Sequence, residues 1–517
     1  MQKRKTKIIW SIHHRELLNE KKLKAHSSLL LKNEIDLIHI YYTSHIKDQC
    51  LKLKELLERQ PQRKKPLKNS SQCIPFLTSF IGKQAKFFLY LKESILKEGQ
   101  IITTHIHEDI QRCINEIEDY TCNYDSEIIV TDISQVSDIS LGTSLSLGNG
   151  FIELEVVEIL SATKKHITIK SKVKKGGEVS RGIKVSSQDI QTSLFPLLEI
   201  DKQNAQSHFE GISDFILIDK ISNLNELKSL KSILTNKNHI STKKHPTTSI
   251  ESIKKQSVSP KLVLVLDSNT ILENLEDFIK EVDGVLIDRT ALNLCSDINE
   301  VPNIQKGIIK KSQDLCKFII ITSDFFKSMS HSATPTRAEI TDIAYTVLDG
   351  NDAILMSPEV TTSQYRKEAA YYLCDAILKS EELIAKDYKI PLDSKFSSHE
   401  SALAQGALEM AVLSGAKAVV CFTEGGYTVA KLSSLKSHLD IIALTYSEEI
   451  KKQLKIFSSV SCVSLDKELK VEELITFSRH YLESELKFKK GSKFVFISLT
   501  ASIISKTDSN FFTLQEI

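Results

Sequence analysis

Pro335-Thr336-Arg337-Ala338-Glu339 is the most diagnostic stretch of the chain, and Asp342-Ile343-Ala344 and Val347-Leu348-Asp349-Gly350 continue it. Proline suits the first position of a helix, because no backbone donor is needed there. The stretch therefore predicts a helix that begins at Pro335. The apolar run at 318–321, which precedes it, predicts a strand, so the local unit is strand followed by helix.

The same strand–helix unit repeats on both sides of this stretch. A helical segment is expected at 225–231, next to a short apolar run. Repeated units of this length favour a parallel sheet closed into a (β/α)8 TIM barrel. The expected barrel strands are Lys7–Ile12, Ile35–Tyr42, Phe215–Ile218, Leu262–Leu266, Gly284–Ile287 and Phe318–Ile321.

Two other sequence patterns occur, one within the barrel pattern and one after it. Between about 90 and 200, short alternating runs such as 151–157 and 166–170 lie between glycine turns, which predicts a small β domain inserted into the barrel. Beyond about 387, an Ala- and Leu-rich helix at 404–414 and buried strands indicate a separate α/β domain. The expected domains are 1–89 and 201–386 for the barrel, with a loop insertion at 235–260, then 90–200 for the β domain and 387–517 for the C-terminal domain.

Composition limits the classes of function. The 517 residues are enough for about three domains. With 68 basic and 66 acidic side chains, the net charge of +2 argues against binding to nucleic acid or to a membrane surface. The nine cysteines are dispersed and have no metal-binding spacing, which indicates reduced thiols. No apolar run is long enough to span a bilayer. We expect a cytoplasmic protein.

With this order of elements in view, the chain resembles the pyruvate kinase family over nearly its full length. The resemblance implies a barrel, an inserted β lid and a C-terminal regulatory domain. It also implies phosphoryl transfer between phosphoenolpyruvate and ADP in glycolysis, Mg²⁺ and K⁺ as cofactors, and a homotetramer. The matching segments are Lys5–Ile9, Gly150–Val156, Lys175–Glu178, Ser213–Ile216, Val282–Arg289 and Pro335–Glu339.

The cationic groups that the resemblance implies are replaced. The strand that carries the family's Arg aligns with Ile38–Ser44, which places His39 at the Arg position and Tyr41 at the Asn position. The Lys of the family's Lys-Ile-Glu-Asn segment aligns with Val265. The family's charged segment near residues 70–84 aligns with an uncharged stretch, Cys73–Phe80. A permanently charged, bidentate guanidinium is thus exchanged for an imidazole.

The implied metal ligands are also changed. Asp267 stands at the position of the family's Glu ligand, and Ala291 stands where the second carboxylate is expected. Ser323 keeps a hydroxyl at the family's Thr position. Mg²⁺ depends on each of its few protein oxygens, so one remaining carboxylate is a poor site. In each case a structural alternative stands beside the functional one: Asp267 as a solvated strand-end cap, His39 as a hydrogen-bonded buried residue.

Two hypotheses for function follow, and the sequence leaves the enzyme question open. The first is a catalytically impaired homologue kept as a scaffold, sensor or oligomer partner. The second is an active, slow pyruvate kinase that uses Asp267 and Ser323. Lys261, Arg289 or Lys327 would support the second if one of them pointed toward Asp267. The adjacent His13-His14 pair has no third ligand at a suitable spacing.

One ligand loop and one helix complete the set of candidates. Thr423-Glu424-Gly425-Gly426-Tyr427-Thr428 follows a strand and resembles the family loop that binds the phosphate of a sugar-phosphate effector. Thr423, Glu424, Gly425, Gly426 and Thr428 are its candidate contacts, and a tight turn that needs glycine is the alternative. Arg337 and Glu339 are interpreted as structural. Ser505–Asn510 resembles the family's final loop in part.

Overall fold

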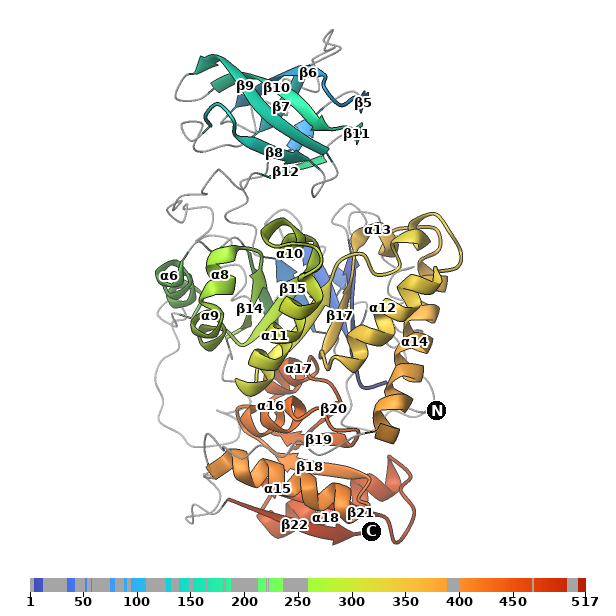
Figure 1. Cartoon of the computed structure of the whole chain (residues 1–517). Helices are drawn as coiled ribbons and strands as arrows, with labels where there is room; N and C mark the ends of the chain where they lie inside the picture. The colour runs from blue at the N-terminus through green and yellow to red at the C-terminus, as the bar shows by residue number, and fades with distance from the viewer. Residues whose placement is uncertain are drawn as a thin grey trace.

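The chain is described from a computed structural model, whose ribbon is drawn in Figure 1. The structure describes residues 4–12, 35–41, 52–53, 57, 75–79, 88–90, 94–107, 127–131, 139–147, 152–162, 166–179, 183–186, 213–219, 221, 223–235, 259–387, 399–466, 469–499 and 510–517. The expectations for His13-His14, for most of the 235–260 insertion and for Ser505–Ser509 lie outside these residues.

Parallel strands form a closed barrel in the order β1-β17-β16-β15-β14-β13-β3-β2, which confirms the predicted fold class. Each strand that the sequence analysis expected in the barrel is present, within two residues at either end. The barrel strands are β1 (Lys7–Ile12), β2 (Leu37–Tyr41), β3 (Phe76–Ser79), β13 (Phe215–Ile218), β14 (Lys261–Leu266), β15 (Gly284–Asp288), β16 (Phe318–Thr322) and β17 (Ala353–Met356).

Helices cover the outside of the barrel (Figure 1). The helix expected from Pro335–Glu339, α12, begins at Arg337 and not at Pro335, because Thr336 is the N-cap and its side chain accepts from the amide of Glu339. The helices around the barrel are α6 (Leu224–Thr235), α8 (Asn269–Glu273), α9 (Leu275–Glu281), α10 (Arg289–Cys295), α11 (Val301–Asp314), the 3₁₀ helix η5 (Lys327–Ser330), α12 (Arg337–Leu348), α13 (Pro358–Thr361) and α14 (Arg366–Asp387).

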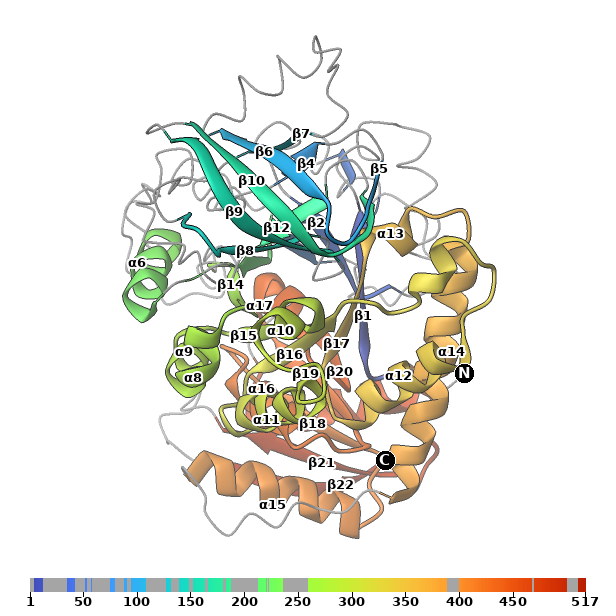
Figure 2. The ribbon, with the colours of Figure 1, turned by 45° about the horizontal axis from the view of Figure 1, so that its top comes forward.

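The inserted β domain is a second closed barrel, in the order β10-β6-β7-β4-β12-β8-β9. We call it the lid, because it lies over the end of the large barrel from which α10 and α13 start (Figures 1 and 2). Its strands are β4 (Phe88–Tyr90), β6 (Ile101–His107), β7 (Glu127–Thr131), β8 (Ser144–Leu147), β9 (Ile152–Ala162), β10 (His166–Lys175) and β12 (Ile183–Ser186), and the pair β5 (Ser94–Leu96) and β11 (Gly177–Val179) accompanies them.

The C-terminal domain is a five-stranded sheet in the order β20-β19-β18-β21-β22, of which only β22 is antiparallel to its neighbour. It lies under the end of the barrel opposite the lid (Figure 1). Its elements are α15 (His399–Leu413), β18 (Ala418–Phe422), α16 (Tyr427–Ser434), β19 (Asp440–Thr445), α17 (Glu448–Leu454), β20 (Val460–Ser464), α18 (Val471–Ser484), β21 (Lys493–Ser498) and β22 (Phe511–Glu516).

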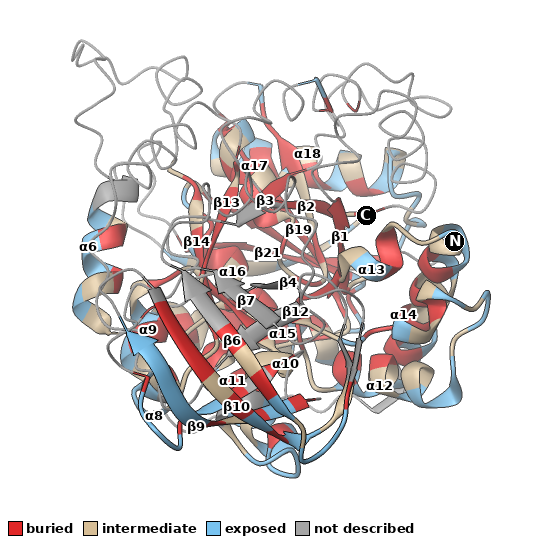
Figure 3. Ribbon diagram, turned by 90° about the horizontal axis from the view of Figure 1, so that it is seen from above, coloured by how far each residue is buried: buried red, intermediate tan, exposed pale blue. Residues whose placement is uncertain are grey.

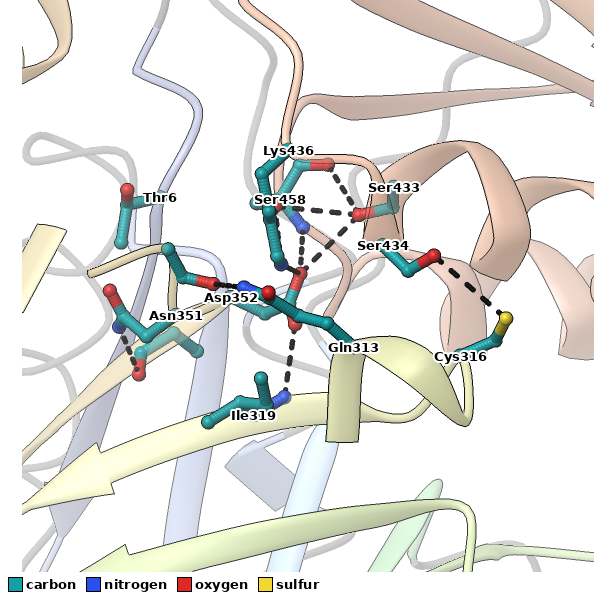
Figure 4. Close-up of polar contacts among 12 residues, drawn as sticks. Thr6, Gln313, Cys316, Ile319, Asn351, Asp352, Ser433, Ser434, Lys436 and Ser458 are labelled. Atoms are coloured by element: carbon teal, nitrogen blue, oxygen red, sulfur yellow. Dashed lines mark hydrogen bonds and ion pairs between the residues drawn. The ribbon is translucent and has the colours of Figure 1, made fainter. Parts of the chain in front are cut away.

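The C-terminal domain closes the floor of the barrel. Ile456 and Phe457, which follow α17, join the apolar cluster inside the barrel, and the ring of Phe457 meets Phe318 edge-on with centroids 5.5 Å apart. A second contact joins the two domains: Asp352, which precedes β17, forms an ion pair of 2.5 Å with Lys436 (Figure 4). The Asp352 carboxylate also accepts from the amide of Ser458 at 2.9 Å. The barrel and the C-terminal domain are therefore joined by buried apolar and ionic contacts.

Alternation along the strands divides the barrel core into two layers. Residues such as Val263 and Val265 belong to the cluster inside the barrel, whereas Leu264 and Leu266 belong to the cluster between strands and helices. Strand β1, for example, is buried along its whole length (Figure 3, viewed from above). This alternation is the period of two that any strand imposes on its side chains. It also fixes which residues at the strand ends can face the barrel mouth.

Candidate functional site

The candidate active site is the barrel mouth, where the carboxyl ends of the parallel strands meet beneath the lid (Figure 2). Val265, at the position where the resemblance implies Lys, lies on the inward layer of β14 and is 6% exposed. Its neighbours in the interior cluster include Leu286 and Leu355. An ammonium is therefore absent at this position, and its surroundings are apolar.

Two aspartates occupy neighbouring register positions at the ends of β14 and β15. Leu266 pairs with Ile287, so Asp267 and Asp288 are the next residues along the same register. Asp267 and Asp288 both continue the set of alternate residues that faces the barrel interior. Neighbouring parallel strands lie about 4.8 Å apart. Sequence reasoning missed Asp288. Extending the period-two pattern of β15 by one residue would have placed it at the mouth.

Asp288 already has three donors on one oxygen. Its Oδ1 accepts from the hydroxyl of Ser323 at 2.5 Å and from the amides of Thr290 and Ala291 at 3.0 and 3.3 Å. The two amide contacts make Asp288 the N-cap of α10. Ala291, the second implied ligand position, lies in the first turn of that helix and has no ligand atom. Asp288 thus caps the helix from which the family's carboxylate would project.

Ser323 lies in a strained loop that follows β16. Its φ is 84°, and Asp324 and Phe326 have φ of 62° and 54°, values in the left-handed region that non-glycine residues seldom adopt. The hydroxyl donates to Asp288, and the carbonyl accepts from Arg289 at 2.6 Å. Such strain persists only when surrounding contacts over-determine the backbone. The hydroxyl predicted from the sequence is therefore present and is held by Asp288.

Arg289 provides much of that restraint and is not aimed at Asp267. Its guanidinium forms a two-bond ion pair with Asp342 of α12, at 2.5 and 2.8 Å. The same group lies 4.3 Å from the ring centroid of Phe325. A bidentate, stacked geometry of this kind is specific to arginine. Arg289 therefore fastens the Ser323 loop to α12.

The two other candidate cations form ion pairs elsewhere. Lys261 begins β14 and forms an ion pair of 2.9 Å with Asp283. Because Asp267 is six residues further along the strand, the two lie at opposite ends of the barrel, about 20 Å apart. Lys327 forms an exposed ion pair of 3.1 Å with Asp324. The ion pairs described for Lys261, Arg289 and Lys327 are thus with Asp283, Asp342 and Asp324.

His39 occupies the implied Arg position and faces into the barrel. It pairs in register with Ser11 of β1, and its Nδ1 lies 2.8 Å from the Ser11 hydroxyl. Burial lowers the pKa of His39 to about 4, because the charged imidazolium would lose its hydration. The ring is neutral near pH 7. A neutral, hydrogen-bonded imidazole replaces the permanent positive charge that the family's arginine would provide.

The described residues do not reproduce the Mg²⁺ site that the resemblance implies. Asp267 supplies one carboxylate, Ala291 supplies no ligand, and one oxygen of Asp288 is already hydrogen-bonded three times. Among the side chains that the structure describes, no three of His, Cys, Asp and Glu gather to hold a metal. For K⁺, the side chain of Tyr41 and residues 43–44 lie outside the described part. The donor set at the mouth therefore does not fit the Mg²⁺ site of the family.

Glu339 connects the start of α12 to the 3₁₀ helix η5 that precedes it. Its carboxylate accepts from the amide and hydroxyl of Ser328 at 2.8 and 2.6 Å and from the amide of Thr336 at 2.8 Å. Burial opposes the charge, but the hydrogen bonds from Ser328 and Thr336 outweigh it and lower the pKa of Glu339. Arg337 is exposed. The contacts of Glu339 support the structural interpretation given to it.

The 423–428 loop forms a compact turn between β18 and α16. The amide of Gly426 donates to the hydroxyl of Thr423 at 2.9 Å. Thr423 and Thr428 are each 1% exposed. Glu424 is half-buried, and burial raises the pKa of its carboxyl. Only Gly425 of the five candidate contacts is exposed. These features are typical of a turn, and a carboxylate in the loop disfavours a phosphate.

Substituting the two glycines tests the turn directly. Gly426 has φ of 89°, and a Cβ there would lie 2.9 Å from Cδ2 of Leu454. Gly426→Ala should lower the free energy of unfolding by about 2–3 kcal/mol through left-handed strain and overpacking. Gly425→Ala is the matched control, because its Cβ would meet no atom within 4 Å. Urea unfolding measures both. Equal effects of the two changes would contradict the structural interpretation.

Comparison with known proteins agrees with this architecture. The family model described as "Pyruvate kinase, barrel domain" matches residues 91–370, and "Pyruvate kinase, alpha/beta domain" matches residues 401–510. A pyruvate kinase of Staphylococcus aureus strain MRSA252 is 26% identical over 71% of this chain and 59% of its own length. One of Thermotoga maritima is 27% identical over 81% of this chain and 80% of its own.

Solved structures of this architecture include a pyruvate kinase from Cryptosporidium parvum. It aligns with a TM-score of 0.76 at 19% identity, over 99% of this chain and 96% of that one. A Cryptosporidium parvum pyruvate kinase in complex with ADP aligns with a TM-score of 0.77 at 18% identity, over 100% and 96%. The class is thus a lidded (β/α)8 barrel with a C-terminal α/β domain. The chain belongs to the pyruvate kinase family.

Proposed function

We propose that this protein is a catalytically impaired member of the pyruvate kinase family, retained as a scaffold, sensor or oligomer partner. The observation that carries the proposal is the charge at the barrel mouth. Phosphoenolpyruvate and ADP are anions, and phosphoryl transfer depends on positioning and on neutralising developing charge. The described mouth has carboxylates at Asp267 and Asp288, a neutral His39 and the apolar Val265.

The expected deficit is large. Removing one group that stabilises transition-state charge costs about two to three decades in rate. Here the Arg and Lys positions are neutral, and the second ligand position is an alanine. These effects do not add fully, because the groups act together. We still expect turnover to fall below that of an ordinary family member by at least about a hundredfold.

The alternative is a slow but active pyruvate kinase. The observation that favours it is the register of β14 and β15, which places Asp288 next to Asp267 at the strand ends. A second acid is therefore at the mouth although Ala291 replaces the expected ligand. Ser323 would keep its hydroxyl oriented by Asp288. In this case Asp267 would be the surviving metal ligand, with Mg²⁺ and K⁺ as cofactors.

A coupled assay for pyruvate distinguishes the impaired protein from the slow but active enzyme. The full chain is supplied with phosphoenolpyruvate, ADP, Mg²⁺ and K⁺, and formation of pyruvate is followed. The proposal expects a rate at least about a hundredfold below that of an ordinary pyruvate kinase assayed in parallel, with no further loss in Asp267→Ala. Asp324→Ala is the matched control, because Asp324 is exposed and pairs with Lys327. A rate that disappears in Asp267→Ala and survives in Asp324→Ala would establish the active alternative.

The remaining parts of the proposal concern assembly, ligand and location. By family resemblance we propose a homotetramer, which light scattering can check, since a monomer at micromolar concentration would contradict it.

The turn-like geometry of 423–428 leads us to propose that no sugar phosphate binds there, a point that calorimetry with fructose 1,6-bisphosphate tests. We also propose a cytoplasmic location for this relative of glycolytic enzymes. In the described residues, no helix is long and apolar enough to cross a membrane.

A further inference from the structure

Lysines from separate elements converge on one turn at the floor of the barrel. This turn, residues 281–283, joins α9 to β15, and α6 and α9 pack against each other on the flank of the barrel (Figures 1 and 2). Lys231 of α6 forms an ion pair of 3.0 Å with Glu281, the first residue of the turn. Lys261, the first residue of β14, forms an ion pair of 2.9 Å with Asp283, the last residue of the turn.

Lys317 brings a third ammonium group to the same turn. It directly precedes β16, and β14 and β16 are the two neighbours of β15 in the barrel, so Lys261 and Lys317 stand on either side of the start of β15. The ammonium of Lys317 donates to the carbonyl of Val282 at 2.6 Å. Within the part of the chain that the structure describes, no carboxylate forms an ion pair with Lys317, and Asp283 acts on it only as a nearby charge.

The described side chains around the turn carry more positive than negative charge. Two carboxylates face four ammonium groups: Glu281 and Asp283 against Lys228, Lys231, Lys261 and Lys317. Burial lowers the pKa of Lys317, and although Asp283 opposes this, the charges of Lys231 and Lys261 lower the pKa further. The ammonium of Lys317 is thus half-buried among like charges, an arrangement that an added anion would stabilise.

The cluster is open to solvent, and its charge suits a phosphate. The side chains of Lys231 and Lys261 are 40% and 33% exposed. A phosphate group carries about 1.5 to 2 negative charges near pH 7 and has three strong acceptor oxygens. It can therefore accept from more than one ammonium group and balance the excess charge. Lysine binds phosphate as a compact charge on a flexible stem, which suits side chains that come from three different elements.

We propose that Lys231, Lys261 and Lys317 form a binding site for a dianionic phosphate group at the floor of the barrel. The shared chemistry is the phosphate, which inorganic phosphate or a small phosphate monoester could supply. The site lies at the end of β14 opposite to Asp267 and the lid, and it does not depend on phosphoryl transfer. Bound phosphate would connect α6 to the starts of β14 and β16.

Calorimetry tests the site with the full-length chain and without substrate. Inorganic phosphate is titrated in one arm and glycerol 3-phosphate in the other, in a phosphate-free buffer at constant ionic strength. Tighter binding of the first indicates the free ion, and tighter binding of the second indicates a monoester. Lys317→Met should weaken binding of the tighter probe by about ten- to a hundredfold, because a charge-assisted hydrogen bond is lost. Lys310→Met, which removes an exposed partner of Asp314, is the matched control and should bind as the wild type does.

Chemical labelling of the wild-type chain locates the bound phosphate. Acetic anhydride acetylates lysine amines, and mass spectrometry of peptides measures the extent at each position. Phosphate should protect Lys261 and Lys317 and leave the exposed Lys310 as reactive as before. Lys317→Arg keeps the positive charge and should retain most of the affinity, which separates the loss of a phosphate contact from a loss of folding.

Two results would overturn the proposal. One is that neither probe binds at millimolar concentration, in which case the lysines form structural contacts only. The other is binding that is unchanged in Lys317→Met and gives no protection of Lys261 and Lys317. Because phosphoenolpyruvate and ADP are absent from both experiments, their outcome is independent of the pyruvate assay.

Discussion

Replacing Lys436 with methionine is expected to lower the free energy of unfolding by about 3 kcal/mol. Lys436 pairs at 2.5 Å with Asp352, which is 2% exposed and lies between the barrel and the C-terminal domain (Figure 4). Removing one partner of a buried ion pair leaves the other charge uncompensated, which typically costs about 3–5 kcal/mol. The amides of Ile319 and Ser458 still donate to Asp352, so the lower end of that range is expected.

Urea unfolding followed by tryptophan fluorescence measures the change in the free energy of unfolding. The chain has one tryptophan, Trp10, and it is buried in β1 of the barrel. A shift of its transition on substitution in the C-terminal domain would show that the domains unfold together. Lys310→Met is the control, because Lys310 forms an exposed pair with Asp314 and should change stability by less than about 1 kcal/mol. Equal shifts for the two variants would refute the role assigned to the Asp352–Lys436 pair.

Acidification is expected to destabilise the protein through His39. Its pKa is about 4 in the folded state, whereas an ordinary histidine, as in an unfolded chain, has a pKa of 6.5. Between these values the unfolded chain binds the proton and the folded one does not, so stability rises with pH. The full contribution is present above pH 6.5 and is lost as the pH falls toward 4. The loss should be about 2 kcal/mol between pH 7 and pH 5, and about 3 kcal/mol by pH 4.

The measurement is the free energy of urea unfolding at a series of pH values. In His39→Leu the difference between pH 7 and pH 5 should shrink by about 2 kcal/mol relative to the wild type, because the leucine takes up no proton. His331→Leu removes an exposed histidine from the segment between η5 and α12 and should leave the difference unchanged. If the two variants have the same pH dependence, His39 does not control acid stability.

The barrel mouth combines a rigid frame with altered chemistry. Arg289, Asp342 and Glu339 hold the loop after β16 in place, and Ser323 keeps a left-handed backbone within it. Strain of this kind is retained only where neighbouring contacts impose it. The loop geometry at the mouth is thus restrained while the groups that would neutralise substrate charge are exchanged. This combination supports the proposal of a catalytically impaired family member.

The sequence predicted the fold well because the signals are local and periodic. Apolar runs such as Leu262–Leu266 and Gly284–Ile287 are read as buried strands without knowledge of their partners, and alternation with glycine turns marks the inserted β domain. Boundaries were less certain: α12 begins at Arg337 because Thr336 is its N-cap. Proline at 335 favours a helix start, and only the cap geometry decides the residue.

The site was predictable only in part. The family resemblance predicts that charge is replaced at His39, Val265 and Ala291, since the identity of a side chain determines whether it can be a cation or a ligand. The roles of Asp288 and Arg289 were not visible. Asp288 meets Ser323 across 35 positions of chain, and Arg289 meets Asp342 across 53. Such contacts depend on strand register and helix packing, which no local pattern encodes.

The order of residues was enough to establish βα units with an inserted β domain, because periodicity follows from the geometry of a single strand or helix. Through the family resemblance, it also predicted which charges are replaced. The places of the remaining charges emerged from folding: Lys261 at the barrel floor and Arg289 against α12. Distances between residues far apart in the chain arise only when the barrels close, because closure sets which strands become neighbours.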